Sequence, residues 1–216
     1  MSLLDIFLPL FSYTINVVTS ENDENHLTHG EDVGGGGRTS SDIREQLLAL
    51  HKQIVSQAKE NFFSCEDVAL ATLATLICVD EIILCSGSRL ADTWQYHLLQ
   101  DELPVRGLGG IVFFEKLADI DVSNHPLREL YLFCIFIGFK GKYIIDGETS
   151  LAHIIDEEIS KLPLDYQDCL QRNKNSVWNY QAPPNSDVSN KGQLTLLIFC
   201  VSIIFVFVIS NTLLIN

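Results

Sequence analysis

The segment Asp67–Leu84 reads DVALATLATLICVDEIIL and decides the fold of this chain. Apolar side chains cover every side of the helix that this segment predicts, whereas a surface helix has one apolar stripe. Ser64, with Asp67 three residues later, has the pattern of a helix N-cap. The segment therefore predicts a helix at the centre of a domain, enclosed by other helices.

Two adjacent acids, Asp80 and Glu81, interrupt this apolar segment near its end. Burying two like charges costs several kcal/mol, of the order of the desolvation penalty for each ion, unless the charges are paired or exposed. The two carboxylates must therefore reach a cleft, a helix end or a basic group. Asp80 and Glu81 are the candidate site residues of the chain.

The sequence around this segment predicts an all-α domain of about seven helices, because no convincing strand pattern occurs. A first helix over 1–18 has a predicted stripe of Leu4, Phe7, Leu8, Phe11, Ile15 and Val18, and contains Pro9. An acidic, glycine-rich loop over 19–41 follows, and we expect the next helix to start with a capping box of Asp42 and Glu45. The other predicted helices are 42–60, the segment after Ser64, 91–102, a short helix with Phe113 and Phe114, one starting at Pro126 and stopping at Gly138, and 150–162.

The end of the chain predicts a membrane anchor. Residues 193–215 contain no charged side chain, and about 20 apolar residues span the hydrocarbon layer as a helix. Arg172, Lys174 and Lys191 precede this span, and basic residues near a span stay in the cytoplasm. We therefore expect a cytoplasmic domain over 1–162, a polar linker over 163–192, and an anchor whose C-terminus lies outside.

Composition narrows the classes of function. The net charge of −14 argues against binding of nucleic acid or of an anionic lipid surface, since both need Lys and Arg. The six cysteines form no C-x-x-C pair, and Cys78 and Cys134 lie in apolar segments typical of reduced, buried thiols. His26 and His29 have the spacing of metal ligands, but the predicted loop preorganises no site. We expect neither a metal nor a cofactor.

The motifs of the chain, taken in order, resemble the TssL/DotU (IcmH) family of type VI and type IVB secretion systems. The resemblance covers about 3–162 and the anchor. The matching residues are Asp80-Glu81; Trp94 and Leu98-Leu99; Gly109-Gly110-x-x-Phe113-Phe114-Glu115-x-Leu117; and Pro126, Glu129-Leu130-Tyr131, Cys134 and Gly138-Phe139-x-Gly141-x-Tyr143. The segment 85–88 departs from the family, because it reads CSGS where a T-P-W element is usual.

The resemblance implies a tail-anchored protein of the bacterial inner membrane with a hook-like cytoplasmic domain of two small helical bundles. It implies a structural role without enzymatic activity, in association with an IcmF/TssM-like inner-membrane protein and with baseplate components such as a TssK-like protein. It also implies self-association through the transmembrane helix. Asp80 and Glu81 would line the cleft between the bundles and face a partner. The secretion type, VI or IVB, stays open.

Three alternatives remain at this point. The two acids could pair within the fold instead of facing a partner. The chain could be a tail-anchored adaptor of another pathway. It could also be a membrane-tethered enzyme in which Asp80, Glu81 and His97 act in acid–base catalysis, although no nucleophile elbow, phosphate loop or zinc signature supports this.

Overall fold

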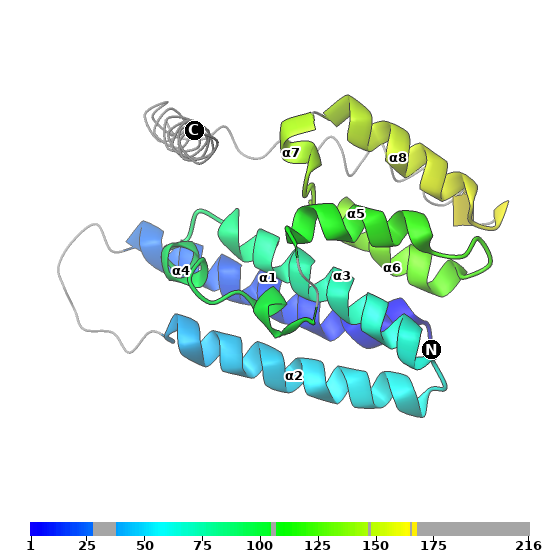
Figure 1. Cartoon of the computed structure of the whole chain (residues 1–216). Coiled ribbons are helices and arrows are strands. Elements are labelled where there is room, and N and C mark those ends of the chain that lie inside the picture. The colour runs from blue at the N-terminus through cyan, green and yellow to red at the C-terminus, as the bar shows by residue number, and fades with distance from the viewer. Residues whose placement is uncertain (28–37, 105–106, 147, 165, 168–216) are drawn as a thin grey trace, which may run out of the picture. The chain divides into compact units, whose positions relative to one another are not determined.

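The computed structural model describes residues 1–27, 38–104, 107–146, 148–164 and 166–167, and these residues are entirely helical apart from turns and connections (Figure 1). The predicted all-α fold is confirmed. The elements are α1 (Leu3–Leu27), α2 (Ser40–Glu60), α3 (Cys65–Leu84), α4 (Arg89–Trp94), the 3₁₀ helix η1 (Leu99–Glu102), α5 (Gly109–Asp119), α6 (His125–Phe136), α7 (Tyr143–Asp146) and α8 (Glu148–Ser160).

Helix α3 lies at the centre, as its composition predicts. It contacts α1, α2, α4, η1, α5 and α6, and in Figure 1 it lies between α2 and α5. Ser64 caps its first turn, because its hydroxyl accepts the backbone N–H of Asp67 at 2.9 Å. Leu76, Cys78 and Val79 are essentially fully buried. Each large aliphatic side chain buried in this way contributes about 1.5–3 kcal/mol.

Helix α1 is longer than predicted, since it continues to Leu27 through residues that the sequence analysis placed in a loop. Pro9 lies inside this helix. The predicted stripe is correct at Phe7 and Phe11 but wrong at Ile15, which is exposed. The buried face of α1 is shifted by about one residue toward the N-terminus from the predicted stripe, because α2, α3 and α6 all pack against it. Its buried side chains are Leu3, Ile6, Phe7, Leu10, Phe11, Thr14 and Val17.

The N-terminal helix also meets the length and composition of a membrane span over Leu3–Glu21, with a mean hydropathy of 1.4. In the structure this helix packs its apolar face into the core of the domain. The predicted anchor over 193–215 and the linker over 163–192 lie outside the described residues, apart from residues 163–164 and 166–167.

The start of α2 differs from the predicted capping box. The N-cap is Thr39, whose hydroxyl accepts the N–H of Asp42 at 3.1 Å, and the Asp42 carboxylate accepts the N–H of Thr39 at 3.0 Å. The prediction placed Asp42 at the N-cap, three residues too late. Because a threonine hydroxyl and an aspartate satisfy two helix-end donors reciprocally, the helix begins at Ser40.

The helix predicted over 91–102 is wrong, because two short helices, α4 and η1, replace it. Between them the chain turns after Trp94 and restarts at Leu99. The backbone N–H groups of Leu99 and Gln100 donate to Asp80 instead of to a preceding helical turn. A buried acceptor on α3 thus replaces the helical hydrogen bonds that local propensity favours.

The C-terminal half follows the predictions more closely. Asn124 caps α6 by accepting the N–H of Leu127, and Pro126 lies in its first turn. Gly138 ends the helix region with a φ of +117°, which only glycine adopts readily. The connection between Gly138 and the helix predicted over 150–162 contains one extra turn of helix, α7.

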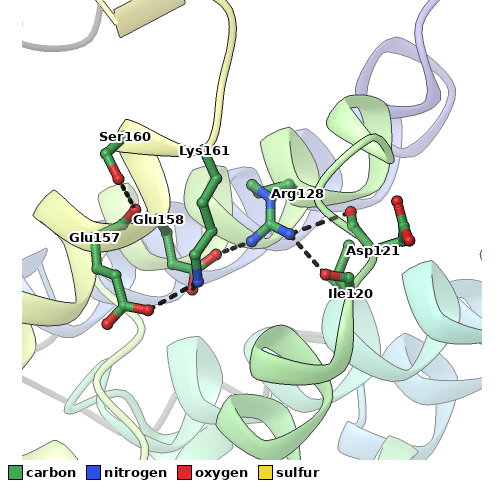
Figure 2. Close-up of polar contacts among 7 residues, drawn as sticks. All are labelled: Ile120, Asp121, Arg128, Glu157, Glu158, Ser160 and Lys161. Atoms are coloured by element: carbon green, nitrogen blue, oxygen red, sulfur yellow. Dashed lines mark hydrogen bonds and ion pairs between the residues drawn. The ribbon is translucent and has the colours of Figure 1, made fainter.

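A buried ion pair joins α8 to α6 (Figure 2). The Arg128 guanidinium pairs with Glu158, and both side chains are almost fully buried. Arg128 Nη2 also donates to the carbonyl of Ile120 at 2.8 Å, and Lys161 Nζ lies 2.7 Å from the second oxygen of Glu158. The network fixes α8 on α6 and on the connection between α5 and α6.

The buried hydrophobic side chains of the described helices form a single cluster that runs from α1 to α8. The expected division into two small bundles is therefore not seen as two separate cores. Helix α3 supplies side chains to the packing on all sides, which explains why one core serves the whole helical unit.

Candidate functional site

Asp80 is buried, with 2% of its surface exposed, and its carboxylate is fully engaged within the fold. Its Oδ1 accepts the indole N–H of Trp94 at 2.8 Å and the backbone N–H of Leu99 at 2.9 Å, and its Oδ2 accepts the N–H of Gln100 at 2.9 Å. These donors replace water around the carboxylate. Asp80 thus holds α4 and the start of η1 against α3.

Glu81 points to a different part of the chain. Its Oε1 accepts the backbone N–H of Lys140 at 2.6 Å, and its Oε2 accepts the N–H of Gly141 at 3.1 Å. Two consecutive backbone N–H groups turned toward one anion form a small anion-binding concavity. Glu81 therefore fixes the turn between α6 and α7.

Burial shifts the pKa of both acids upward. Desolvation raises the pKa of Asp80 to about 6, against the lowering effect of its three hydrogen bonds. Desolvation likewise raises the pKa of Glu81, although the N–H groups of Lys140 and Gly141 act in the opposite direction. The C-terminal end of a helix is also unfavourable for negative charge. The hydrogen bonds from α4, η1 and the α6–α7 turn therefore offset the cost of placing two carboxylates at this end of α3.

The glycine and aromatic motifs of α5 and of the α6–α7 turn meet in one place. Gly110 and Gly141 touch backbone to backbone: a Cβ built on Gly110 would lie 2.8 Å from Gly141 Cα. The N–H of Lys142 donates to the carbonyl of Gly110 at 3.3 Å. The ring centroid of Phe139 lies 4.3 Å from that of Phe113. Two motifs that are about 30 residues apart in the sequence thus form one contact.

A cleft opens beside this contact, with a volume of about 500 Å³. Glu81, Gly110, Gly141 and Lys142 supply its polar and backbone lining. Its other lining residues are apolar and largely exposed, at Leu108 (73%), Ile111 (39%) and Ile145 (90%). Exposed aliphatic side chains gathered around a hollow are typical of a protein-binding surface.

The structure separates the two predicted site residues. Glu81 lines the cleft, whereas Asp80 lies in the interior and is not part of the lining. Backbone and indole N–H groups donate to the two acids. The charge of Lys140 also acts on Glu81 and lowers its pKa, so Lys140 is the kind of basic partner that the internal-pairing alternative supposed. In the described part of the chain, no hydrogen bond joins the exposed His97 ring to either acid. This arrangement offers no pair of free carboxylates for acid–base chemistry.

The hydrogen-bond partners of both acids could not be read from the sequence. Trp94 was quoted only as part of a motif, and its spacing from Asp80 gave no signal of an indole–carboxylate bond. The turn at Lys140 and Gly141 carried a signal, since glycine is typical of turns and Gly141 has a φ of +49°. Phe113, Phe114 and Tyr131 are buried and belong to the core. Cys78 and Cys134 are free, buried thiols, as predicted.

No three His, Cys, Asp or Glu side chains within the described ranges are grouped so that they could hold a metal ion. Cys169 and Cys200 lie outside these ranges, as do residues 28–37, which include His29 and the run of four glycines.

Comparisons with known proteins agree with the arrangement of the motifs. A solved structure, the cytoplasmic domain of TssL from Acinetobacter baumannii, superposes with a TM-score of 0.60 at 26% identity, and the match covers 77% of this chain and 99% of that chain. A search of curated proteins gave no match. The family model of the type VI secretion system protein DotU matches residues 2–213. Because that match extends over nearly the whole sequence, this chain belongs to the DotU family of type VI secretion system proteins.

Proposed function

We propose that this protein is a non-enzymatic scaffold of a type VI secretion membrane complex. In this role it links an IcmF/TssM-like inner-membrane protein to baseplate components such as a TssK-like protein. The single observation that carries the proposal is the cleft beside Glu81, where the family's glycine and aromatic motifs converge under a rim of exposed aliphatic side chains.

The cleft suits a partner protein better than a small substrate. Its rim residues Leu108 and Ile145 are both largely exposed. A partner that covers them removes this apolar surface from water, and the hydrophobic effect then favours binding. Lys142 adds a cation at the edge of the cleft. Glu81 contributes by positioning the α6–α7 turn, and Asp80 contributes by positioning α4 and η1 from within.

Co-isolation tests the role in the complex. Full-length tagged protein, extracted from its native membranes, should retain the IcmF/TssM-like protein. Ile145→Asp should reduce this retention roughly tenfold, because it places a charge on the apolar rim. The matched control is Ile15→Asp, at an exposed isoleucine of α1 outside the cleft. Equal retention by both variants and the native protein would exclude the cleft as the contact surface.

For topology, we propose a cytoplasmic helical domain over 1–162, a linker over 163–192 and an anchor over 193–215 that also supports self-association. The basic residues before the predicted span and the absence of charge within it support this orientation. A phosphatase that is active only in the periplasm, fused after Asn216, should be active. An inactive fusion that is nevertheless membrane-bound would reverse the proposed orientation.

A further inference from the structure

A second hollow lies on another part of the domain, between helices α2 and α3. These two helices run antiparallel (Figure 1). Its volume is about 420 Å³. Val55 of α2, Val68 and Leu73 of α3, and Pro104 after η1 provide its apolar lining. We call this hollow the α2–α3 groove.

The charge in the α2–α3 groove is opposite to that of the protein. The whole chain has 28 acidic and 14 basic side chains, yet the described lining of the groove includes Lys59 and Lys116 and no acid. Within the described structure, Lys59 makes no ion pair, and Lys116 has only a loose one, at 3.8 Å to the exposed Asp119. His51 also lines the groove, and its ring is hydrogen-bonded to Thr72 at 3.1 Å. The groove is thus apolar with two available cations.

An unusual aromatic residue lies at one end of this groove. Phe62 is 96% exposed and has a φ of +65°, a left-handed conformation that bulky residues rarely adopt. It belongs to the turn between α2 and α3, three residues from the groove residues Lys59 and Cys65 on either side. An exposed phenylalanine held in a strained turn contributes nothing to the core. Such residues are concentrated at functional sites and at binding hot spots.

We propose that the α2–α3 groove is a second docking site, which takes an amphipathic segment of a partner protein. Apolar side chains of that segment enter the groove, Phe62 packs against it, and an Asp or Glu of the segment pairs with Lys59 and Lys116. The mode is that of a helix laid in an apolar groove, with charge at the rim giving orientation and specificity.

A protein segment fits these observations better than a membrane surface. An anionic bilayer is extended, so it would face much of a protein whose net charge is −14, and the two lysines would not offset that repulsion. A short segment meets mainly the lining of the groove, whose charged side chains are Lys59 and Lys116. The volume of the groove also falls in the range that a few large side chains fill.

The groove is distinct from the cleft beside Glu81. Val68 and Leu73 lie 8 to 13 residues before Glu81 on α3, which corresponds to roughly 12–20 Å along the helix axis. A scaffold with two separate docking sites can hold two partners at once. The inference therefore goes beyond the proposed role of the cleft.

Photo-crosslinking in native membranes tests the proposal. Benzoylphenylalanine, a close analogue of phenylalanine, replaces Phe62 in the full-length protein, and the crosslinked peptide is sequenced by mass spectrometry. A second protein carries the same probe in place of Tyr96, which is also well exposed but lies outside the groove. We expect the probe at position 62, and not the probe at 96, to capture one segment with apolar residues at helical spacing and a nearby Asp or Glu.

Charge reversal provides the decisive comparison. Lys59→Glu with Lys116→Glu should lower the yield of this crosslink roughly fivefold. The control, Lys52→Glu with Arg89→Glu, makes the same change of charge at exposed residues outside the groove and should leave the yield unchanged. Equal thermal unfolding of the two double variants excludes misfolding. A lipid adduct, an adduct with a second copy of the chain, no adduct, or a yield insensitive to reversal at Lys59 and Lys116 would each overturn the proposal.

Discussion

Asp80 and Glu81 are neighbours in the sequence, but each stabilises a different part of the fold. Asp80 holds α4 and η1, and Glu81 holds the α6–α7 turn. Both acids accept hydrogen bonds from backbone N–H groups that have no acceptor within a helix. Each carboxylate and its N–H donors therefore satisfy one another. The end of α3 therefore fixes three otherwise separate segments, which are α4, η1 and the α6–α7 turn.

The raised pKa of Asp80 predicts a pH dependence of stability. The folded state holds the Asp80 proton up to about pH 6, whereas an unfolded aspartate loses it near pH 4. The folded state binds more protons in this window, so the stabilisation present below pH 4 is lost as the pH rises through 6. Between pH 4 and pH 7, the free energy of unfolding of the native domain should fall relative to that of Asp80→Asn by about 2–3 kcal/mol.

Urea unfolding of residues 1–172, followed by circular dichroism at several pH values, measures this difference. The comparison with Asp80→Asn removes the contribution of other groups, including Glu81, whose raised pKa acts in the same direction. A difference that is constant or that grows with pH would show that Asp80 is not desolvated in the fold.

The contact between Gly110 and Gly141 predicts a strong effect of one methyl group. In Gly110→Ala the new Cβ would lie 2.8–3.1 Å from backbone atoms of Gly141 and Lys142, which cannot move aside as a flexible side chain can. We expect the melting temperature to fall by about 8 °C or more, which corresponds to roughly 2–3 kcal/mol. Differential scanning calorimetry of residues 1–172 measures the shift.

Gly87→Ala is the control for this substitution. Gly87 has a φ of +69° but no atom within 4 Å of its Cβ position, so it reports only the cost of the backbone conformation, about 1 kcal/mol. If both variants lose the same stability, the close approach at Gly110 contributes nothing.

At the scale of elements, the ion pair between Arg128 and Glu158 joins α8 to the rest of the core. Removal of one partner leaves a buried charge, so Arg128→Met should destabilise by about 3–5 kcal/mol. The double variant Arg128→Met with Glu158→Met should recover at least half of that loss, because two apolar side chains of similar volume then face each other. A double-mutant cycle in urea measures both. Additive losses would mean that the two residues do not interact.

The elements could be predicted from the sequence where local signals agree with the packing. The cap at Ser64, the helix start at Pro126 and the stop at Gly138 are local signals, and the structure confirms them. The division of 91–102 into α4 and η1 could not be predicted, because its cause is Asp80, a residue 19 positions before Leu99. The turned face of α1 depends on the three helices that surround it.

The candidate site shows the same limit. The unusual position of Asp80 and Glu81 in an apolar helix was visible in the sequence, but their donors come from segments that only the folded chain brings near. The sequence did contain one signal of the buried Arg128–Glu158 ion pair. Glu158 lies three residues after Ile155 and seven after Leu151, which places it on the apolar face of α8. An acid on such a face needs a buried partner, and Arg128 is the residue that meets it.

At the scale of the whole molecule, the described part of the helical domain has at least two open surfaces of different character. The cleft beside Glu81 has an aliphatic rim that the α6–α7 turn presents. The α2–α3 groove has an apolar lining with two lysines. Both depend on α3, whose N-terminal half borders the groove and whose C-terminal end fixes the cleft. Membership of the DotU family places these surfaces in a type VI secretion apparatus.

The central claim is that Glu81 and the rim beside it form a partner-binding surface. Calorimetric titration of residues 1–172 with the purified cytoplasmic part of the IcmF/TssM-like partner tests this most directly. Ile145→Asp should weaken binding roughly tenfold with unchanged thermal unfolding, because Ile145 is 90% exposed. Glu81→Gln should weaken binding by releasing the α6–α7 turn, whereas Ile15→Asp should bind like the native domain. Native affinity in both Ile145→Asp and Glu81→Gln would contradict the account.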